Sequence, residues 1–278
     1  MQTKRKIFLE EPWYLFKKTK FIELSFCPEG SYVQKILNNK KTRINFERGF
    51  WMMSTLVTDW MVYFLDEGVN IKLNGIDTKV TIRNPNWYLK IPKPLKGFEN
   101  YPFKFDMLQD ILNFCARLTN YARNTDQIKM NEYFDLPNQA EWVYASYAGT
   151  DAEENKWFFG NDITLLNDYC WSKENSDGQT FKPVRLKKPN PWGFYDMYGN
   201  IEERCYYKYL FVDFTKEVNQ NFYGSLLDKT LASEYIGVQN GCVNTDESQC
   251  FALNQGIDEN INSWGFDYGT RLVLRSEW

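Results

Sequence analysis

Apolar residues recur at helical spacing in the first half of the chain. A run of steps of three and four residues joins Phe105, Leu108, Leu112, Cys115, Leu118 and Ala122. Positions at such steps share one face of a helix, so the pattern predicts a helix over residues 106–122 with this face buried. The apolar stretch Leu56–Leu65 predicts a second helix, which begins behind Ser54 or Thr55.

Capping residues predict a third helix after Pro137. Asn138 can accept a hydrogen bond from a free backbone amide of the first turn, and Glu141, three residues on, can reach back to the cap. Trp142 and Ala145 then face inward.

Alternation of apolar and polar residues predicts strands near both ends of the chain. Ile22–Phe26 is the first, and Thr270–Arg275 is the last. In the last strand Leu272 and Leu274 lie on one face and Val273 on the other. We expect this strand to lie near the first one.

From about residue 150 onward the helical periodicity is lost. Gly, Asn, Asp and Pro are spaced between aromatic residues, with few runs long enough for regular elements. Large aromatic side chains with a polar tip can hold such irregular structure together. Candidates for this role are Trp157, Trp171, Trp192, Tyr195 and Trp264.

The composition excludes several classes of function. The 278 residues are 43% hydrophobic and carry a net charge of -3, so a packed globule is expected and a nucleic-acid partner is not. There is no histidine, which excludes Ser-His-Asp and Cys-His catalysis, HExxH zinc sites and histidine-ligated iron. The six cysteines include no CxxC pair, so we expect buried free thiols.

No secretory leader or transmembrane segment is evident in the sequence. The most apolar stretch, residues 50–65, contains Asp59 and is shorter than the ~20 apolar residues that span a bilayer. We therefore expect no membrane insertion, and a location in the cytoplasm or in a virus particle. Residues 1–278 are interpreted as one domain, with a Pro-punctuated surface excursion at 83–100 that could serve for docking.

Four segments resemble motifs of the formylglycine-generating enzyme superfamily, which includes sulfatase-modifying factors. They read LVTDW at 56–60, DLPNQAEW at 135–142, PNPWGFYDMYGNIEE at 189–203 and GTRLV at 269–273. The third is long and specific, and the four together span most of the chain. The resemblance implies an α+β fold, namely an elaborated, loop-rich C-type-lectin-like fold.

The same resemblance implies a structural calcium site in the third segment. The ligands carried over are Asn200, Glu203 and the carbonyl of Ile201, and a weaker match places Asp177 in a second site. Alternatively, Glu203 only caps a backbone group or forms a salt bridge. Because the family's ions are enclosed by protein, a calcium-dependent sugar-binding lectin ranks lower.

Catalysis in the family needs two cysteines that bind Cu(I), and this chain matches one of them. Cys250 falls at the second cysteine, while Thr245 lies near the first. Cys242, eight residues before Cys250, could substitute only if the loop folds differently. Copper is therefore not expected as a cofactor, and the family branch that uses iron and a histidine cluster is excluded.

The resemblance and the missing ligand favour a non-enzymatic binding or structural module that contacts protein or glycan through its C-terminal loops. Phage virion components and the variable proteins of diversity-generating retroelements use the scaffold in this way. The candidate binding surface comprises Asn240, Asn244, Asp246, Asn254, Asn260, Asn262 and Tyr268. The alternative without a binding role is that these residues lie in ordinary solvated loops. The alternative function is a copper-dependent oxidase with Cys242 and Cys250 as ligands, converting a substrate cysteine to formylglycine.

Overall fold

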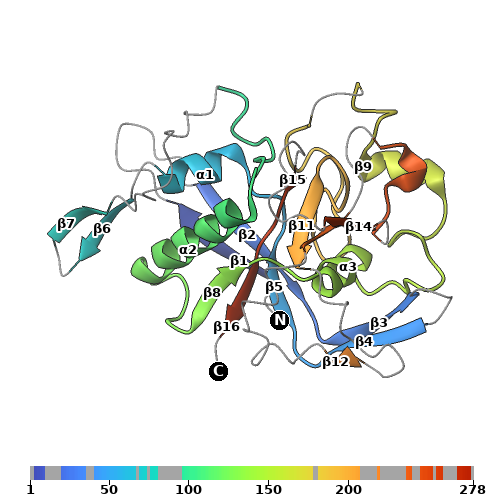
Figure 1. Cartoon of the computed structure of the whole chain (residues 1–278), viewed down its shortest axis with the longest axis horizontal. Coiled ribbons are helices and arrows are strands. Elements are labelled where there is room, and N and C mark those ends of the chain that lie inside the picture. The colour runs from blue at the N-terminus through green and yellow to red at the C-terminus, as the bar shows by residue number, and fades with distance from the viewer. Residues whose placement is uncertain are drawn as a thin grey trace.

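The computed structural model describes residues 3–9, 20–35, 41–66, 69–73, 76–80, 96–177, 181–206, 218–219, 236–239, 245–252, 255–258 and 268–276. Its largest sheet consists of Lys4–Leu9 (β1), Lys20–Cys27 (β2), Phe50–Met53 (β5), Val273–Ser276 (β16) and Glu132–Asp135 (β8). The strand order is β1-β2-β5-β16-β8, and all neighbours are antiparallel (Figure 1). The predicted first and last strands are thus confirmed in one sheet, where β5 separates them.

This sheet lies between two hydrophobic cores. Leu272 and Leu274 are buried in one core, whereas Val273 is buried in the other, because successive side chains of a strand point to opposite faces. Three α-helices supply residues to the cores: Asp59–Asp66 (α1), Leu108–Asn124 (α2) and Gln139–Tyr147 (α3). The first core is shared with α1 and α2, and the second with α3 (Figure 1).

Helix α2 confirms the helix predicted from apolar spacing, whereas α1 begins later than predicted. The backbone of Val57 is already engaged on both sides. Its N–H donates to the carbonyl of Thr270 at 2.8 Å, and its carbonyl accepts from the N–H of Phe103 at 2.9 Å. These bonds hold the segment before Asp59 extended, so the helix cannot extend back to Leu56.

Helix α3 begins with the predicted capping box. The N–H of Glu141 donates to Asn138 Oδ1 at 2.8 Å, and the N–H of Asn138 donates to Glu141 Oε2 at 2.8 Å. Arg275 from β16 donates to the same carboxylate, with Nη1 2.8 Å from Oε1. Every residue of the helix is buried, including Trp142 and Ala145 as predicted. The helix is therefore an interior element, fixed at its first turn to the central sheet.

A second, four-stranded sheet carries the C-terminal part of the chain. Its strands are Gln255–Asp258 (β14), Ile236–Gln239 (β13), Glu202–Tyr206 (β11) and Tyr268–Gly269 (β15), in that order across the sheet. Strand β13 is antiparallel to both β11 and β14, while β15 is parallel to β11.

The remaining elements are short. They are Gly30–Lys35 (β3), Lys41–Phe46 (β4), Val69–Leu73 (β6), Ile76–Val80 (β7), Ile163–Asp168 (3-10 helix η2), Cys170–Trp171 (β9), Tyr198–Gly199 (β10), Val218–Asn219 (β12) and Glu247–Gln249 (3-10 helix η5). Among the described residues between 150 and 200, only β9, β10 and η2 interrupt the loops, which confirms the loop-rich prediction. Most of the predicted excursion, residues 83–95, lies outside the described residues. Within the described part, no helix is long and apolar enough to cross a membrane.

Side chains join the two outer strands of the central sheet. Arg5 of β1 donates to both carboxylate oxygens of Glu132 in β8, at 2.9 and 3.0 Å. The amide of Gln127 both accepts from the N–H of Phe8 and donates to its carbonyl, the latter at 2.9 Å. The loop after α2 therefore bridges the two edges of the sheet.

The capping box gives a first prediction. Asn138→Ala should lower the free energy of unfolding by about 1 kcal/mol, because the Glu141 amide loses its acceptor at a buried helix start. Asn120→Ala, at an exposed position of α2, is the matched control and should change stability by less than about 0.5 kcal/mol. Urea unfolding measures both variants. Equal effects would show that the box contributes nothing.

Candidate functional site

The side chain of Asn190 organises the turn that opens the 189–203 motif. Its Oδ1 accepts from the N–H groups of Trp192 and Phe194, each at 3.1 Å. Gly193 follows with φ of 82°, and the ammonium of Lys4 occupies the space where a Cβ would project. A glycine is therefore required where this turn meets β1.

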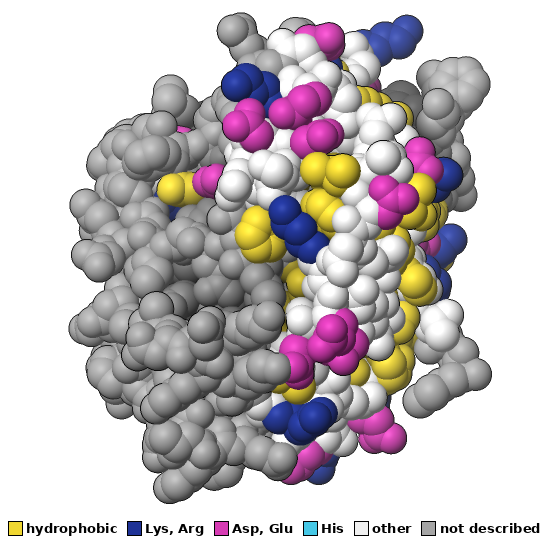
Figure 2. All heavy atoms as spheres, turned by 90° about the vertical axis from the view of Figure 1, so that its right-hand side faces the viewer, with side chains coloured by type: hydrophobic (Ala, Val, Ile, Leu, Met, Phe, Trp, Pro, Cys, Tyr) yellow, Lys and Arg dark blue, Asp and Glu magenta, His cyan; other side chains and the backbone are white. Residues whose placement is uncertain are grey.

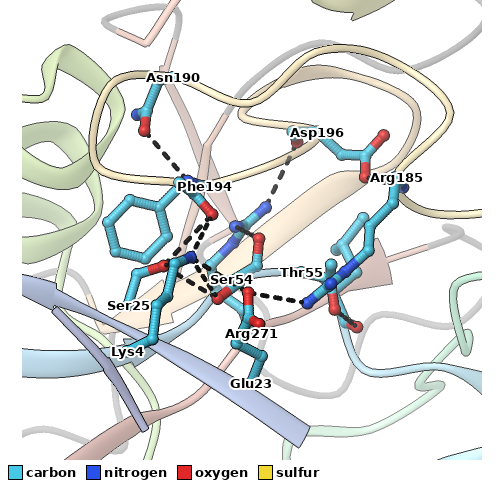
Figure 3. A network of polar contacts seen from close by, with 12 residues as sticks. Lys4, Glu23, Ser25, Ser54, Thr55, Arg185, Asn190, Phe194, Asp196 and Arg271 are labelled. Atoms are coloured by element: carbon cyan, nitrogen blue, oxygen red, sulfur yellow. Dashed lines mark hydrogen bonds and ion pairs between the residues drawn. The ribbon is translucent and has the colours of Figure 1, made fainter.

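Arg271 and Glu203 form an ion pair in the interior, with both side chains 0% exposed. Arg271 Nη2 lies 2.7 Å from Oε1 and Nε lies 2.8 Å from Oε2. Nη2 also donates to the carbonyl oxygens of Tyr195 and Asp196, at 3.0 and 3.3 Å, so the guanidinium holds the motif turn as well (Figure 3). Because Glu203 lies in β11 and Arg271 precedes β16, the pair joins the two sheets.

The predicted calcium ligands do not fit a cation as they are arranged. Both oxygens of Glu203 accept from Arg271, which is the salt-bridge alternative of the sequence analysis. The Asn200 amide accepts from the backbone N–H of Lys182 at 3.0 Å and donates to its carbonyl at 3.1 Å. Calcium would have to displace Arg271 to reach this carboxylate, and the third predicted ligand, the carbonyl of Ile201, belongs to a buried residue.

The second predicted calcium position lies at the protein surface. The side chain of Asp177 is 92% exposed and pairs with Lys182 at 3.2 Å. Among the described residues, no cluster of three or more His, Cys, Asp or Glu side chains could hold a metal ion.

Asp196 is a buried carboxyl group beside this ion pair. Burial raises its pKa to about 6, although the Arg185 backbone N–H, 3.0 Å from Oδ2, and the charge of Arg271 both act to lower it. The Arg185 guanidinium turns away to Glu23, at 3.3 Å (Figure 3).

A lysine and two serines form a polar network at the start of the central sheet (Figure 3). Lys4 Nζ donates to Ser25 Oγ at 2.6 Å, and Ser25 Oγ lies 2.9 Å from Ser54 Oγ. These are residue types that can support nucleophilic catalysis. However, both serines are 0% exposed, and Lys4 is ion-paired with Glu23 at 3.1 Å. The network therefore fixes β1 to the sheet and to the Gly193 carbonyl, which accepts from Lys4 at 3.1 Å.

Glu23 is held in its charged form by this network. Burial acts to raise its pKa, but the hydrogen bond from Lys4 and the charges of Arg185 and Lys4 outweigh it, so the pKa lies below its usual value.

The cysteine matched to the family's copper ligand lies inside the second core. Cys250 is 0% exposed, and its thiol is directed at the carbonyl oxygens of Thr245 and Asp246, at 3.9 and 3.7 Å. The indole N–H of Trp157 donates to the backbone carbonyl of Cys250 at 2.7 Å. Cys242 lies outside the described residues. The buried position of Cys250 does not fit a ligand in an open catalytic cleft.

Two residues of the predicted binding surface, Asp246 and Tyr268, lie within the described part of the structure. Asp246 is exposed and pairs with Lys173 at 3.4 Å. Tyr268, by contrast, is 6% exposed, and the guanidinium of Arg204 lies 4.6 Å from its ring centre, so it belongs to the interior and not to an exposed surface. The other predicted residues lie outside the described residues: Asn240, Asn244, Asn254, Asn260 and Asn262.

Together, these features define a loop-rich α+β domain in which a buried arginine–glutamate pair joins two sheets. Residues 17–259 match the family described as the sulfatase-modifying factor enzyme 1-like domain. The chain therefore belongs to this family, and its fold is of the formylglycine-generating-enzyme type.

Solved structures share the fold over nearly the whole chain. Variable protein 1 of Treponema denticola is similar with a TM-score of 0.70 and 17% identity, covering 99% of this chain and 100% of that one. PvdO of Pseudomonas aeruginosa has a TM-score of 0.57 and 17% identity, over 92% and 95% of the two chains. CarF has a TM-score of 0.55 and 18% identity, over 92% and 98%.

A sequence relative is similar over a shorter segment. The chaperone protein LppX of Paenibacillus barcinonensis is 37% identical over 87 residues, which cover 26% of this chain. The chain thus spans about a third, 31%, of the length of that relative.

The site includes residues that sequence reasoning missed. The Lys4 network and the hydrogen bond from Trp157 to the Cys250 carbonyl join positions far apart in the chain, and no local pattern marks them.

The buried ion pair gives a second prediction. Arg271→Met should lower the free energy of unfolding by about 3–5 kcal/mol, because Glu203 is left buried without a counter-charge. Adding Glu203→Gln should recover part of this loss. The control is Lys188→Met in the exposed pair with Asp168, which should cost less than about 1 kcal/mol. Additive losses in the double variant, measured by urea unfolding, would argue against coupling.

Asp196 gives a third prediction, on pH. Because its pKa is raised to about 6 in the folded protein, the unfolded chain loses this proton first as pH rises, and Asp196 lowers stability progressively between about pH 4 and pH 6. Asp196→Asn keeps an acceptor for the Arg185 amide and removes this effect. The variant should gain on the wild type over this range and reach an advantage of about 2–3 kcal/mol above pH 6. Urea unfolding at several pH values measures it, and a pH-independent difference would contradict the assignment.

Proposed function

We propose that the chain is a non-enzymatic binding module that contacts a protein or a glycan through its C-terminal loops. The observation that carries this proposal is the burial of Cys250, at 0% exposure among the aromatic residues of the second core. Copper chemistry on a substrate would need this sulfur at an accessible surface together with a second one. Here the sulfur is a packing group.

The four-stranded sheet supports a binding role for the C-terminal loops and indicates which loop makes the contact. Gln239 of β13 pairs with Gln255 of β14, so the connection at 240–254 leaves from one end of this hairpin. Ile236 pairs with Asp258, so the connection at 259–267 begins at the opposite end. The predicted surface is thereby divided into two sets. The longer connection carries Asn240, Asn244, Asp246 and Asn254, and we assign the contact to this set.

The described part of the longer connection lies on a mixed surface. Lys156 lies over the rings of Trp157 and Phe251, at 4.9 and 4.7 Å from their centres, and its ammonium donates to the carbonyl of Ser248. The face in Figure 2 carries acidic and basic side chains with hydrophobic ones between them. Aromatic groups next to adaptable polar groups favour recognition of a protein or glycan. The likeness to a protein called variable protein 1 agrees with this role. A phage particle or a retroelement-encoded variable protein is the setting we propose.

Loop substitutions provide the fourth prediction. The full chain is first screened on a glycan array and a protein array, and the affinity for each hit is then measured by calorimetry. Asn240→Ala with Asn244→Ala should weaken binding at least about tenfold, with a melting temperature within about 2 °C of the wild type. The matched control is Asn120→Ala with Asn124→Ala on the exposed face of α2, which should leave binding within about twofold.

Two outcomes would contradict the proposal. One is equal weakening by the loop and control variants. The other is an enzymatic result: wild-type protein supplied with Cu(I) and oxygen oxidises a cysteine in a test peptide to formylglycine, and the Cys250→Ser variant lacks this activity. That second result would establish the copper oxidase.

A further inference from the structure

The middle of the connection between β13 and β14 is attached to another part of the chain, residues 156–174. The N–H of Lys173 donates to the carbonyl of Thr245 at 3.1 Å, and its ammonium lies 3.4 Å from Asp246 Oδ1. At the other end of this segment, the indole N–H of Trp157 donates to the carbonyl of Cys250 at 2.7 Å. Residues 245–250 are therefore held at both ends.

Two charged side chains hold the 3-10 turn η5 between these ends. The carboxylate of Glu174 accepts from the N–H of Glu247, the first residue of η5, at 3.1 Å. The ammonium of Lys156 donates to the carbonyl of Ser248, the next residue, at 2.6 Å. Backbone groups at the ends of a helical turn need partners from outside it. Each charged side chain supplies such a partner.

Both side chains project from turns that are themselves fixed. The N–H of Lys156 donates to Asn161 Oδ1 at 2.7 Å. The turn around Glu174 is closed from both sides, because the N–H of Ser172 donates to Asn175 Oδ1 at 2.9 Å and the N–H of Asn175 donates to the carbonyl of Ser172 at 3.3 Å. A fixed base lets each side chain determine the position of η5.

The attachment divides the connection into shorter parts. Gln239 and Gln255 fix its two ends in β13 and β14, and residues 245–250 add a fixed point between them. Asn240 and Asn244, which we assign to the contact, lie between Gln239 and this point. A segment that is ordered before binding loses less conformational entropy when it binds, so its affinity is higher.

We propose that Lys156 and Glu174 are positioning residues that keep the connection at 240–254 ordered for its contact. This inference rests on the proposed function, because it concerns the same connection. It adds a role for two side chains that lie outside the C-terminal loops.

The first test is hydrogen–deuterium exchange of the full chain, measured by mass spectrometry with fragmentation. It follows the amides of Gln249 and Cys250, which donate within the turn itself and keep their acceptors in every variant. Glu174→Ala and Lys156→Met should each speed this exchange about threefold to tenfold, because the turn opens more often. Glu174→Gln keeps an acceptor oxygen and should restore most of the protection. The matched control, Glu154→Ala at an exposed position, should stay within about twofold.

The second test is calorimetry with the strongest hit of the glycan and protein arrays. The double variant Lys156→Met with Glu174→Ala should weaken binding at least about threefold, since only molecules with an ordered connection can bind. Glu174→Gln alone should bind within about twofold of the wild type. The melting temperature of the double variant should remain within about 3 °C of the wild type, because the two lost contacts lie near the surface.

Unchanged exchange at Gln249 and Cys250 in both single variants would overturn the inference. Full affinity in a double variant that exchanges faster would also overturn it, but would leave the proposed function intact. If the wild type binds no component of either array, the proposed function fails, whereas the exchange rates still decide whether Lys156 and Glu174 order the connection.

Discussion

Two charges that lie wholly in the interior set the arrangement of this domain. Removing Arg271 and Glu203 from water is costly, and hydrogen bonds must offset this cost: here Arg271 makes two to the carboxylate and three to backbone carbonyls. A glutamate from one sheet, an arginine beside the other and a glycine-containing turn must all be in place at once. The pair therefore specifies how the two halves of the fold meet.

The central sheet separates two hydrophobic cores of different character. Alternate residues of its last strand enter different cores, so one side is a helix-covered interior of regular pattern. The other side holds a short buried helix and many aromatic loops. Irregular segments there satisfy their backbone groups through specific side chains, such as Asn190 with two amides and Trp157 with the Cys250 carbonyl. On this side of the sheet, hydrogen bonds from the polar ends of large aromatic side chains take the place of regular backbone hydrogen-bond ladders.

Local signals explain what could be predicted from the sequence. The face of α2 follows from apolar spacing, and the start of α3 follows from Asn138 and Glu141, because those interactions join residues within one or two turns. The predicted start of α1 was wrong because backbone hydrogen bonds from Val57 to distant residues hold the chain extended before Asp59. The role of Glu203 remained open between calcium and a salt bridge, since its partner is 68 residues away. The network of Lys4 and Ser25 had no local sign, because its members lie 21 residues apart.

The amide of Gln127 has a consequence for how copies of this chain can associate. A primary amide carries N–H donors and a carbonyl acceptor, and here one N–H and the oxygen engage the backbone of Phe8 on the outer strand β1, as a peptide group of a neighbouring strand would. Unsatisfied backbone groups on an outer strand recruit strands from other molecules. At Phe8 the Gln127 side chain takes the place that a strand of another molecule would occupy. Edge-to-edge strand pairing between copies of this chain along β1 is thereby disfavoured.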